Sequence, residues 1–191
     1  MMNQNDILQI LGETGALLSG HFELRSGLHS NRFFQCANVL RFPRHAAALC
    51  GELAARAKAD PRVGRVDGVI APALGGLLVG YEIARAWDAP SIFAEKQDNK
   101  LVLRRFTIKP GERYIVAEDV VTRGGRVQET LDILLANGAE AAAVLMLVDR
   151  SGGAAQFPHP THSLMQLVPE VWEPADCPLC KTGSKAVHPG S

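Results

Sequence analysis

The sequence predicts an α/β fold in which a central parallel sheet is flanked by helices. Short apolar segments that read as buried strands alternate with longer segments of helical periodicity, and such alternation is typical of βαβ units. Hydrophobic residues make up 47% of the 191 residues, which is ordinary for one globular domain. Because ligands on parallel sheets bind outside the carboxyl ends of the strands, the residues after each strand are the first candidates for a site.

The N-terminal part is predicted to hold a helix followed by an irregular segment. Apolar side chains recur at helical spacing over residues 6–18. Residues 20–38 form a turn-rich polar stretch that includes the adjacent aromatic residues Phe33 and Phe34. A long helix over residues 43–59 follows, and its initial proline suits a first helical turn.

The middle of the chain carries the strands of the predicted sheet, with helices between them. The strands are expected at residues 66–71, 90–94, 114–117 and 142–148, and the helices at 75–87 and 125–137. Residues 95–113 depart from this alternation. The sequence QDNK is typical of a hairpin turn there, and residues 101–106 read as a strand of an antiparallel flap. After Ser151 the periodicity fades into a proline-rich tail.

Charge and composition exclude several classes of function. Lys+Arg and Asp+Glu both number 20, so the chain has no net charge to hold nucleic acid through its phosphates. The densest apolar run, residues 141–148, is too short for a membrane span. The N-terminus lacks the basic region of a secretory signal, and the four cysteines form no disulfide framework. These observations favour a cytoplasmic protein.

The most informative motif is IVAEDVVTRGGR at residues 115–126. It leads from an apolar strand into two acids, Glu118 and Asp119, and then into a Thr-Arg-Gly-Gly turn and a helix. Backbone N–H groups of such a turn bind phosphate, and paired carboxylates can accept hydrogen bonds from a ribose diol or hold a metal. The spacing matches neither a Walker A loop nor a GxGxxG turn. The motif indicates a sugar-phosphate site, although the acids could instead cap the helix.

This motif resembles the signature that binds phosphoribosyl pyrophosphate (PRPP) in type I phosphoribosyltransferases, and further segments resemble the orotate branch of that family. They are HFELRSGLHS at 21–30 with FFQ at 33–35, PALGG at 72–76, AEK at 94–96 with LRRF at 103–106, VDR at 148–150 and the tail from 177 to 191. The resemblance implies the type I phosphoribosyltransferase fold as a single domain, with a core over about 41–154 and a small hood over about 1–40 and 155–191.

The resemblance also implies an activity: transfer of the phosphoribosyl group of PRPP to orotate, which gives orotidine 5′-monophosphate and pyrophosphate in pyrimidine nucleotide biosynthesis. Mg²⁺ is the implied cofactor, held mainly by PRPP oxygens, with Glu118 and Asp119 as further ligands through water. A homodimer is expected in which the flap of one subunit closes over the site of the other.

Individual residues take roles from the same resemblance. One phenylalanine of the pair is expected in the core and the other against the flat face of the base. The orotate-binding residues are expected to be Arg25, Phe33, Phe34, Thr122 and Arg150. The PRPP-binding residues are expected to be Ala73, Gly75, Gly76, Glu118, Asp119, Thr122, Arg123, Gly124, Gly125 and Arg126. The catalytic residues are expected to be Lys96, Lys100, Arg104, Arg105 and Asp119.

The chain departs from the family pattern in two segments. Arg123 and Arg126 replace small hydroxyl residues of the signature, so their guanidinium groups either contact the 5′-phosphate or point into solvent. The flap has no glycine between Arg105 and Phe106, and it has Glu95 in place of an arginine. The flap cations could also be edge-strand charges that prevent aggregation.

Two other functions stay open. A purine phosphoribosyltransferase would share the PRPP motif but not Arg25 with the two phenylalanines. A non-catalytic PRPP-sensing regulator would keep the fold and lose the flap cations.

The cysteines Cys177 and Cys180 form a CxxC pair, which is half of a zinc site. The missing ligands would have to be His188 or the same pair of a partner chain, so a plain loop is the preferred interpretation. His21 and His29 are expected to make only local hydrogen bonds.

Overall fold

A six-stranded sheet lies at the centre of the computed structural model, which describes residues 2–24 and 26–189. The strand order is β5-β4-β3-β6-β7-β8, and every neighbouring pair is parallel except β4 with β5. The strands are β3 (Gly68–Pro72), β4 (Ser91–Gln97), β5 (Lys100–Val102), β6 (Arg113–Val121), β7 (Glu140–Asp149) and β8 (Thr161–Gln166). The predicted α/β class is confirmed.

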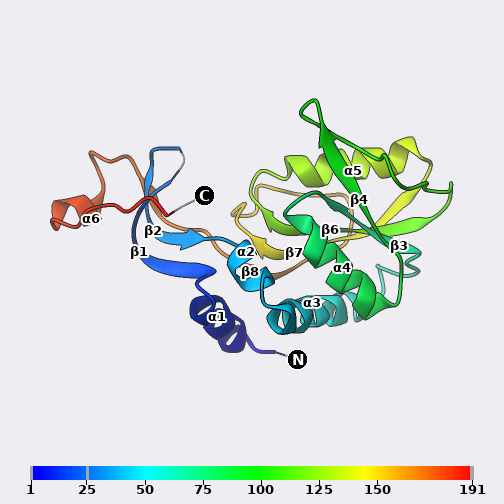
Figure 1. The fold of residues 1–191 in the computed structure, drawn as a ribbon, viewed down its shortest axis with the longest axis horizontal. Coiled ribbons are helices and arrows are strands. Elements are labelled where there is room, and N and C mark those ends of the chain that lie inside the picture. Colours follow the sequence, from blue (N-terminus) through cyan, green and yellow to red (C-terminus); the bar gives the residue numbers. More distant parts are fainter. Residues whose placement is uncertain (1, 25, 190–191) are drawn as a thin grey trace.

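Helices cover both faces of this sheet, because successive residues of the central strands point to opposite sides. Ile115 and Ala117 belong to a core cluster with α3 (Pro43–Lys58) and α4 (Gly76–Trp87). Val116 belongs to a second cluster with α5 (Gly125–Ala136). Figure 1 shows α5 on one side of the sheet and the other two helices on the opposite side. The three predicted core helices are therefore confirmed to within one residue at either end.

The N-terminal segment differs from the prediction. Helix α1 (Gln4–Glu13) ends at a Thr14 cap, and Gly15 has a φ of 68°, so the chain turns into β1 (Leu17–Glu23) instead of continuing the helix. The stretch expected to be irregular forms most of β1 and all of β2 (His29–Phe34), an antiparallel hairpin. A register shift between Ser19 and Phe22 breaks the alternation by which a strand is recognised.

The hood consists of the β1–β2 hairpin, the short strand β9 (Val171–Trp172), which pairs with β2, and the one-turn helix α6 (Pro178–Lys181). The chain also places α2 (Ala37–Leu40) between the hood and α3.

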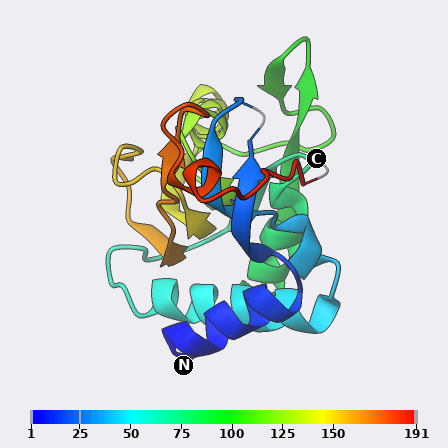
Figure 2. The ribbon, with the colours of Figure 1, turned by 90° about the vertical axis from the view of Figure 1, so that its left-hand side faces the viewer.

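Strand β8 pairs in parallel with β7, so residues 161–166 lie in the core sheet although the hood was expected to take up 155–191. The tail returns to β1, where Val187 donates its N–H to His21 O at 2.9 Å. Figure 2 shows this tail crossing β1.

The flap is formed by β4 and β5, with Gln97 opposite Lys100. Asp98 and Asn99 both have positive φ, 47° and 65°, as a two-residue hairpin turn requires. Strand β5 ends at Val102, four residues before the predicted end at Phe106. No helix in the described part of the chain is long and apolar enough to span a bilayer.

Candidate active site

Two adjacent carboxylates lie near the carboxyl end of β6. The strand extends through Val121, so Glu118 and Asp119 are part of it and do not follow it as predicted. Glu118 is only 6% exposed and accepts the N–H of Asp119 at 3.0 Å. Burial, followed by the neighbouring Asp119 carboxylate, raises the pKa of Glu118 to about 9. The buried Glu118 side chain therefore favours its neutral form when no ligand is bound.

A loop and the first turn of α5 form a hollow beside these acids, the phosphate hollow of the predicted sugar-phosphate site. Gly124 precedes the helix with a φ of 78°, and a Cβ there would lie 3.0 Å from the Phe157 ring, so this turn requires glycine. The cavity has a volume of about 260 Å³. Six of the seven residues expected to bind PRPP in this segment line it, and only Asp119 does not: Glu118, Thr122, Arg123, Gly124, Gly125 and Arg126. The N–H groups of a first helical turn suit an anion at this place.

A second glycine-containing loop packs directly against the acids. A Cβ on Gly75 would lie 2.7 Å from Asp119 Oδ1, and one on Gly76 would lie 2.9 Å from Ala117 O, so both positions need glycine for this close approach. The N–H of Ala73 already donates to Ala94 O at 2.8 Å. The N–H groups that this loop can offer to an anion therefore begin after Ala73. Ala73 itself does not supply the N–H donor that was expected of it as a PRPP-binding residue.

A larger cavity of about 770 Å³ lies between the hood and the core. Four of the five expected orotate-binding residues line it: Phe33, Phe34, Thr122 and Arg150. The fifth, Arg25, lies outside the described residues. Thr122 and Arg123 also line the phosphate hollow. The two cavities therefore share a wall, and ligands bound in them would lie side by side.

The aromatic pair and Arg150 differ in their surroundings. Phe34 is 7% exposed and belongs to the main core cluster, whereas Phe33 is half-buried. Arg150 is also half-buried, and its Nε is buried without a hydrogen-bond partner among the described residues. Burial lowers the pKa of Arg150. An anionic ligand would supply the missing acceptor for this guanidinium.

Several residues that line the large cavity were not among the predicted orotate-binding residues. They are Glu23, Leu24, Ser26, Gln35, His188 and Pro189. Gln35 follows the aromatic pair directly, and it could have been predicted because it belongs to the FFQ segment that resembles the family. His188 and Pro189 arrive from the far end of the chain, so no local spacing could indicate them.

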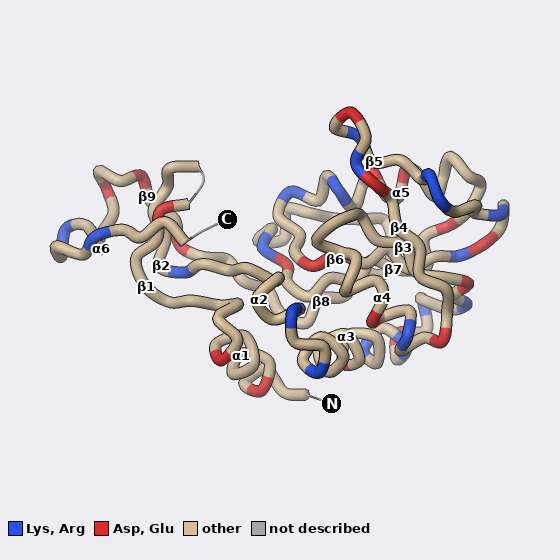
Figure 3. Tube along the Cα trace, viewed as in Figure 1, with Lys and Arg blue, Asp and Glu red and all other residues tan. Residues whose placement is uncertain are grey.

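The flap cations do not line either cavity. Lys96, Lys100 and Arg104 are exposed. Arg105 is exposed as well but forms an ion pair with Glu95, at 3.0 Å between Nε and Oε2. Figure 3 shows charges of both signs on the flap, which projects away from the sheet. The structure therefore does not bring these four cations to the acids.

The two unusual arginines of the turn have different contacts. Arg126 does not point freely into solvent, because its Nη1 lies 3.1 Å from Glu129 Oε2, which also accepts the N–H of Leu101 from the flap at 3.0 Å. Arg123 is exposed and lies on the wall common to both cavities.

Solved structures share this fold. Orotate phosphoribosyltransferase from Aeropyrum pernix superposes with a TM-score of 0.70 at 24% identity, covering 84% of this chain and 93% of that one. Adenine phosphoribosyltransferase from Leishmania donovani gives 0.63 at 18% identity, covering 84% and 79%. The fold is that of the type I phosphoribosyltransferases.

Comparison of the sequence with known proteins identifies the family within this fold class. No family model matches the sequence. The orotate phosphoribosyltransferase of Desulforamulus reducens is 47% identical over all 191 residues, which cover 98% of that protein. That of Thermotoga maritima is 45% identical over 186 residues, covering 97% of each chain. This chain belongs to the orotate phosphoribosyltransferase family.

Proposed function

We propose that this enzyme transfers the phosphoribosyl group of PRPP to orotate and releases pyrophosphate. The observation that carries the proposal is the wall shared by the two cavities. On one side lies a glycine-lined hollow next to paired carboxylates. On the other lies a cavity with an aromatic ring and Arg150, whose Nε has no hydrogen-bond partner among the described residues. Orotate is flat, and its carboxylate is the acceptor that this guanidinium lacks.

The chain's own groups suit the charge changes of such a transfer. The first turn of α5 is suited to the 5′-phosphate, and the loop after Ala73 to pyrophosphate. Asp119 lies directly against the loop that contains Gly75, where it can accept hydrogen bonds from the ribose hydroxyls. As the bond at C1′ breaks, the sugar becomes cationic, and a fixed carboxylate nearby stabilises that charge. As N1 of orotate bonds to C1′ it loses its proton, which the oxygens of the departing pyrophosphate can accept.

The residues present also suit Mg²⁺. The ion prefers carboxylate, phosphate and water oxygens, and the oxygens of Glu118 and Asp119 lie beside both anion-binding loops. Those two carboxylates would hold the ion together with oxygens of PRPP. When bound, Mg²⁺ would neutralise charge on the leaving pyrophosphate.

We further propose a homodimer in which the flap acts on the neighbouring subunit. The flap cations are exposed and lie away from both cavities of their own chain, so another copy could receive them. Large apolar side chains are exposed beside the pyrophosphate loop, on its tip and along α4: Leu74 at 83%, Leu78 at 52% and Tyr81 at 62%. Such a patch next to a site is suited to subunit contact.

A turnover assay with PRPP and Mg²⁺ tests the proposal directly. Orotate should be converted, whereas uracil, adenine and hypoxanthine should give at most a small fraction of its kcat/KM, because none of them carries the carboxylate. Uracil is the matched control, since it differs from orotate by that group alone. Preferred turnover of adenine or hypoxanthine would assign the enzyme to the purine class. PRPP binding without turnover of any base would identify a sensor.

A further inference from the structure

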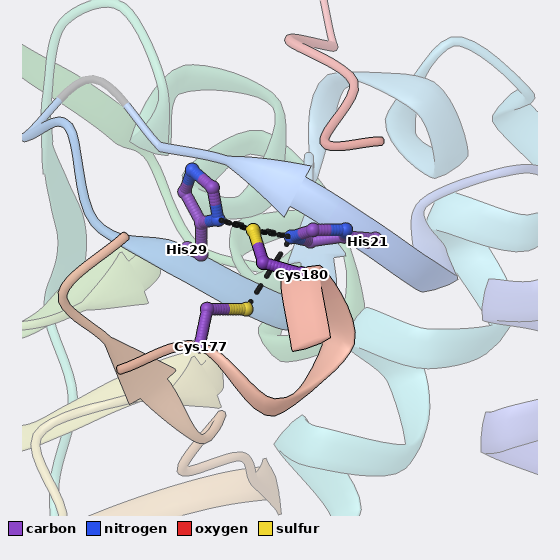
Figure 4. A group of neighbouring side chains, drawn as sticks. All are labelled: His21, His29, Cys177 and Cys180. Carbon is purple, nitrogen blue, oxygen red and sulfur yellow. Dashed lines mark hydrogen bonds between the residues drawn. The ribbon is translucent and has the colours of Figure 1, made fainter. Parts of the chain in front are cut away.

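The hood contains a group of four metal-binding side chains that the transfer reaction does not use. They are His21 on β1, His29 on β2, and Cys177 and Cys180 at the start of α6. Their ligand atoms all lie within 4.8 Å of one another. Figure 4 shows the two sulfurs and two ring nitrogens pointing toward a common centre. We infer that these four residues form a structural zinc site.

The spacing of the ligand atoms matches a tetrahedral zinc ion. Zn–N bonds of about 2.05 Å and Zn–S bonds of about 2.3 Å give N···N, N···S and S···S edges of roughly 3.3, 3.6 and 3.8 Å. His21 Nε2 lies 3.4 Å from Cys177 Sγ and 3.8 Å from Cys180 Sγ. His29 Nδ1 lies 3.4 Å from Cys180 Sγ and 2.9 Å from His21 Nε2. Of these four separations only the one between the imidazole nitrogens is shorter than its zinc edge by about half an ångström, and the two remaining pairs lie within 4.8 Å.

The chemistry of the donors selects the ion. Two sulfurs and two imidazole nitrogens in a tetrahedral arrangement favour zinc over Mg²⁺ or Ca²⁺, which take oxygen ligands. Two thiolates balance the charge of Zn²⁺, so the complex is neutral and can be buried at little cost. His21, His29 and Cys177 are indeed buried, and four protein ligands leave no open position for catalysis.

A further contact orients one ligand. The other ring nitrogen of His21, Nδ1, lies 3.2 Å from the Ser184 hydroxyl. Histidines that bind metals commonly use their second nitrogen in this way, which fixes the tautomer that leaves Nε2 free to coordinate. The further ligands that the sequence suggested, His188 or a partner chain's cysteines, are not needed for this site, because His21 and His29 complete it and His188 lines the large cavity.

The hood needs such a cross-link because it has little core of its own. Among the described residues, neither hydrophobic cluster includes any member from residues 18–33 or from α6. Small assemblies of this kind are commonly stabilised by a metal. The ion would join both strands of the β1–β2 hairpin to the tail. Beyond Val187, which pairs with β1, His188 and Pro189 reach the wall of the large cavity.

Metal analysis of the purified full-length protein tests the site. Protein produced with zinc and dialysed against metal-free buffer should retain about one zinc per chain. Cobalt substitution should give the intense visible bands of tetrahedral thiolate coordination. Cys177→Ser and His29→Ala should each lose most of the metal and these bands. Cys50→Ala and His45→Ala, which change the same residue types in α3, should keep both. Ser184→Ala should weaken zinc binding by about 10-fold.

A fluorescence measurement separates loss of metal from general unfolding. Trp172 pairs with His29 in the hood, and Trp87 is the only other tryptophan in the sequence. In a Trp87→Phe background, removal of zinc should change the Trp172 emission while far-ultraviolet circular dichroism keeps the α/β signal of the core, and added zinc should reverse the change. Wild-type protein that holds no zinc after exposure to the ion, or that contains a Cys177–Cys180 disulfide instead, would overturn the inference. Because the zinc takes no part in phosphoribosyl transfer, either result leaves the proposed function standing.

Discussion

Replacement of Arg150 by alanine provides the sharpest test of how the enzyme selects its base. Its guanidinium Nε is buried at the cavity wall and lacks a hydrogen-bond partner among the described residues. Hydrogen bonds to charged groups contribute about 1.5–3 kcal/mol, and each 1.4 kcal/mol changes an equilibrium constant about tenfold. Arg150→Ala should therefore raise the Kd for orotate about 10- to 150-fold.

The free enzyme should tolerate this change well. Burial without a partner lowers the pKa of Arg150, which means that its charge is not compensated in the absence of ligand. Removing the charge should leave the melting temperature of the ligand-free protein close to that of the wild type. The loss should be confined to binding of the anionic base.

Calorimetric titration with orotate and with PRPP measures both affinities separately. Arg150→Lys should lie between wild type and Arg150→Ala, because lysine keeps the charge but not the planar fork. Arg32→Ala is the matched control, since it removes the same charge from β2 but lies outside the large cavity. Equal losses of affinity for orotate and PRPP, or loss for Arg32→Ala as large as for Arg150→Ala, would refute the assignment.

Four further predictions follow from the site. Chelation with EDTA should abolish turnover and excess Mg²⁺ should restore it, with zinc content measured in parallel so that any loss of the hood metal is recognised. Asp119→Asn should lower kcat more than it changes the KM for orotate, because the carboxylate acts as the sugar becomes cationic. A mixture of Lys100→Ala subunits with Asp119→Asn subunits should recover about a quarter of wild-type activity, although each variant alone is inactive. About half of the random dimers contain one subunit of each kind, and one of the two sites in such a dimer is intact. Finally, the pKa of Glu118 is raised to about 9 in the folded protein, so the free energy of unfolding of the ligand-free protein should fall as pH rises. The stabilisation is complete below the usual carboxyl pKa and is lost as pH approaches 9. Glu118→Gln should reduce this loss.

Each of these four has a result that contradicts it. Full turnover in EDTA would exclude the metal, and an Asp119→Asn effect limited to the KM for orotate would move that residue to the base. Activity of the mixture no higher than the mean of its parents, with mixed dimers verified by two different tags, would mean that each flap serves its own subunit. Identical pH profiles of unfolding free energy for wild type and Glu118→Gln would show that Glu118 is not the group responsible.

Local periodicity was enough to predict the core. Helices α3, α4 and α5 and strands β3, β6 and β7 each bury a continuous or regularly spaced apolar set, so their patterns do not depend on distant residues. The phosphate hollow was predictable for the same reason, because a strand, a turn and a helix N-terminus that follow one another in sequence form it.

The hood was not predictable in this way. In β1 the irregularity between Ser19 and Phe22 disturbs the alternation of buried and exposed side chains. Strand β8 begins with polar residues and buries only Leu164 and Met165, which is too short a signal to stand out in a proline-rich segment. The zinc ligands come from three separate segments of the chain, so sequence spacing revealed only the cysteine pair.

The return of the tail to β1 has a consequence for the order of folding. Cys177 meets His21 across a separation of 156 residues, whereas the turn proposed to bind phosphate is complete within a few residues of β6. Closing a long loop costs more chain entropy than closing a short one, and contacts between distant residues slow folding. A folding chain would therefore acquire its phosphate hollow first and its base cavity last. Until the tail docks, the protein would be able to bind a sugar phosphate but would lack part of the wall against which the base must lie.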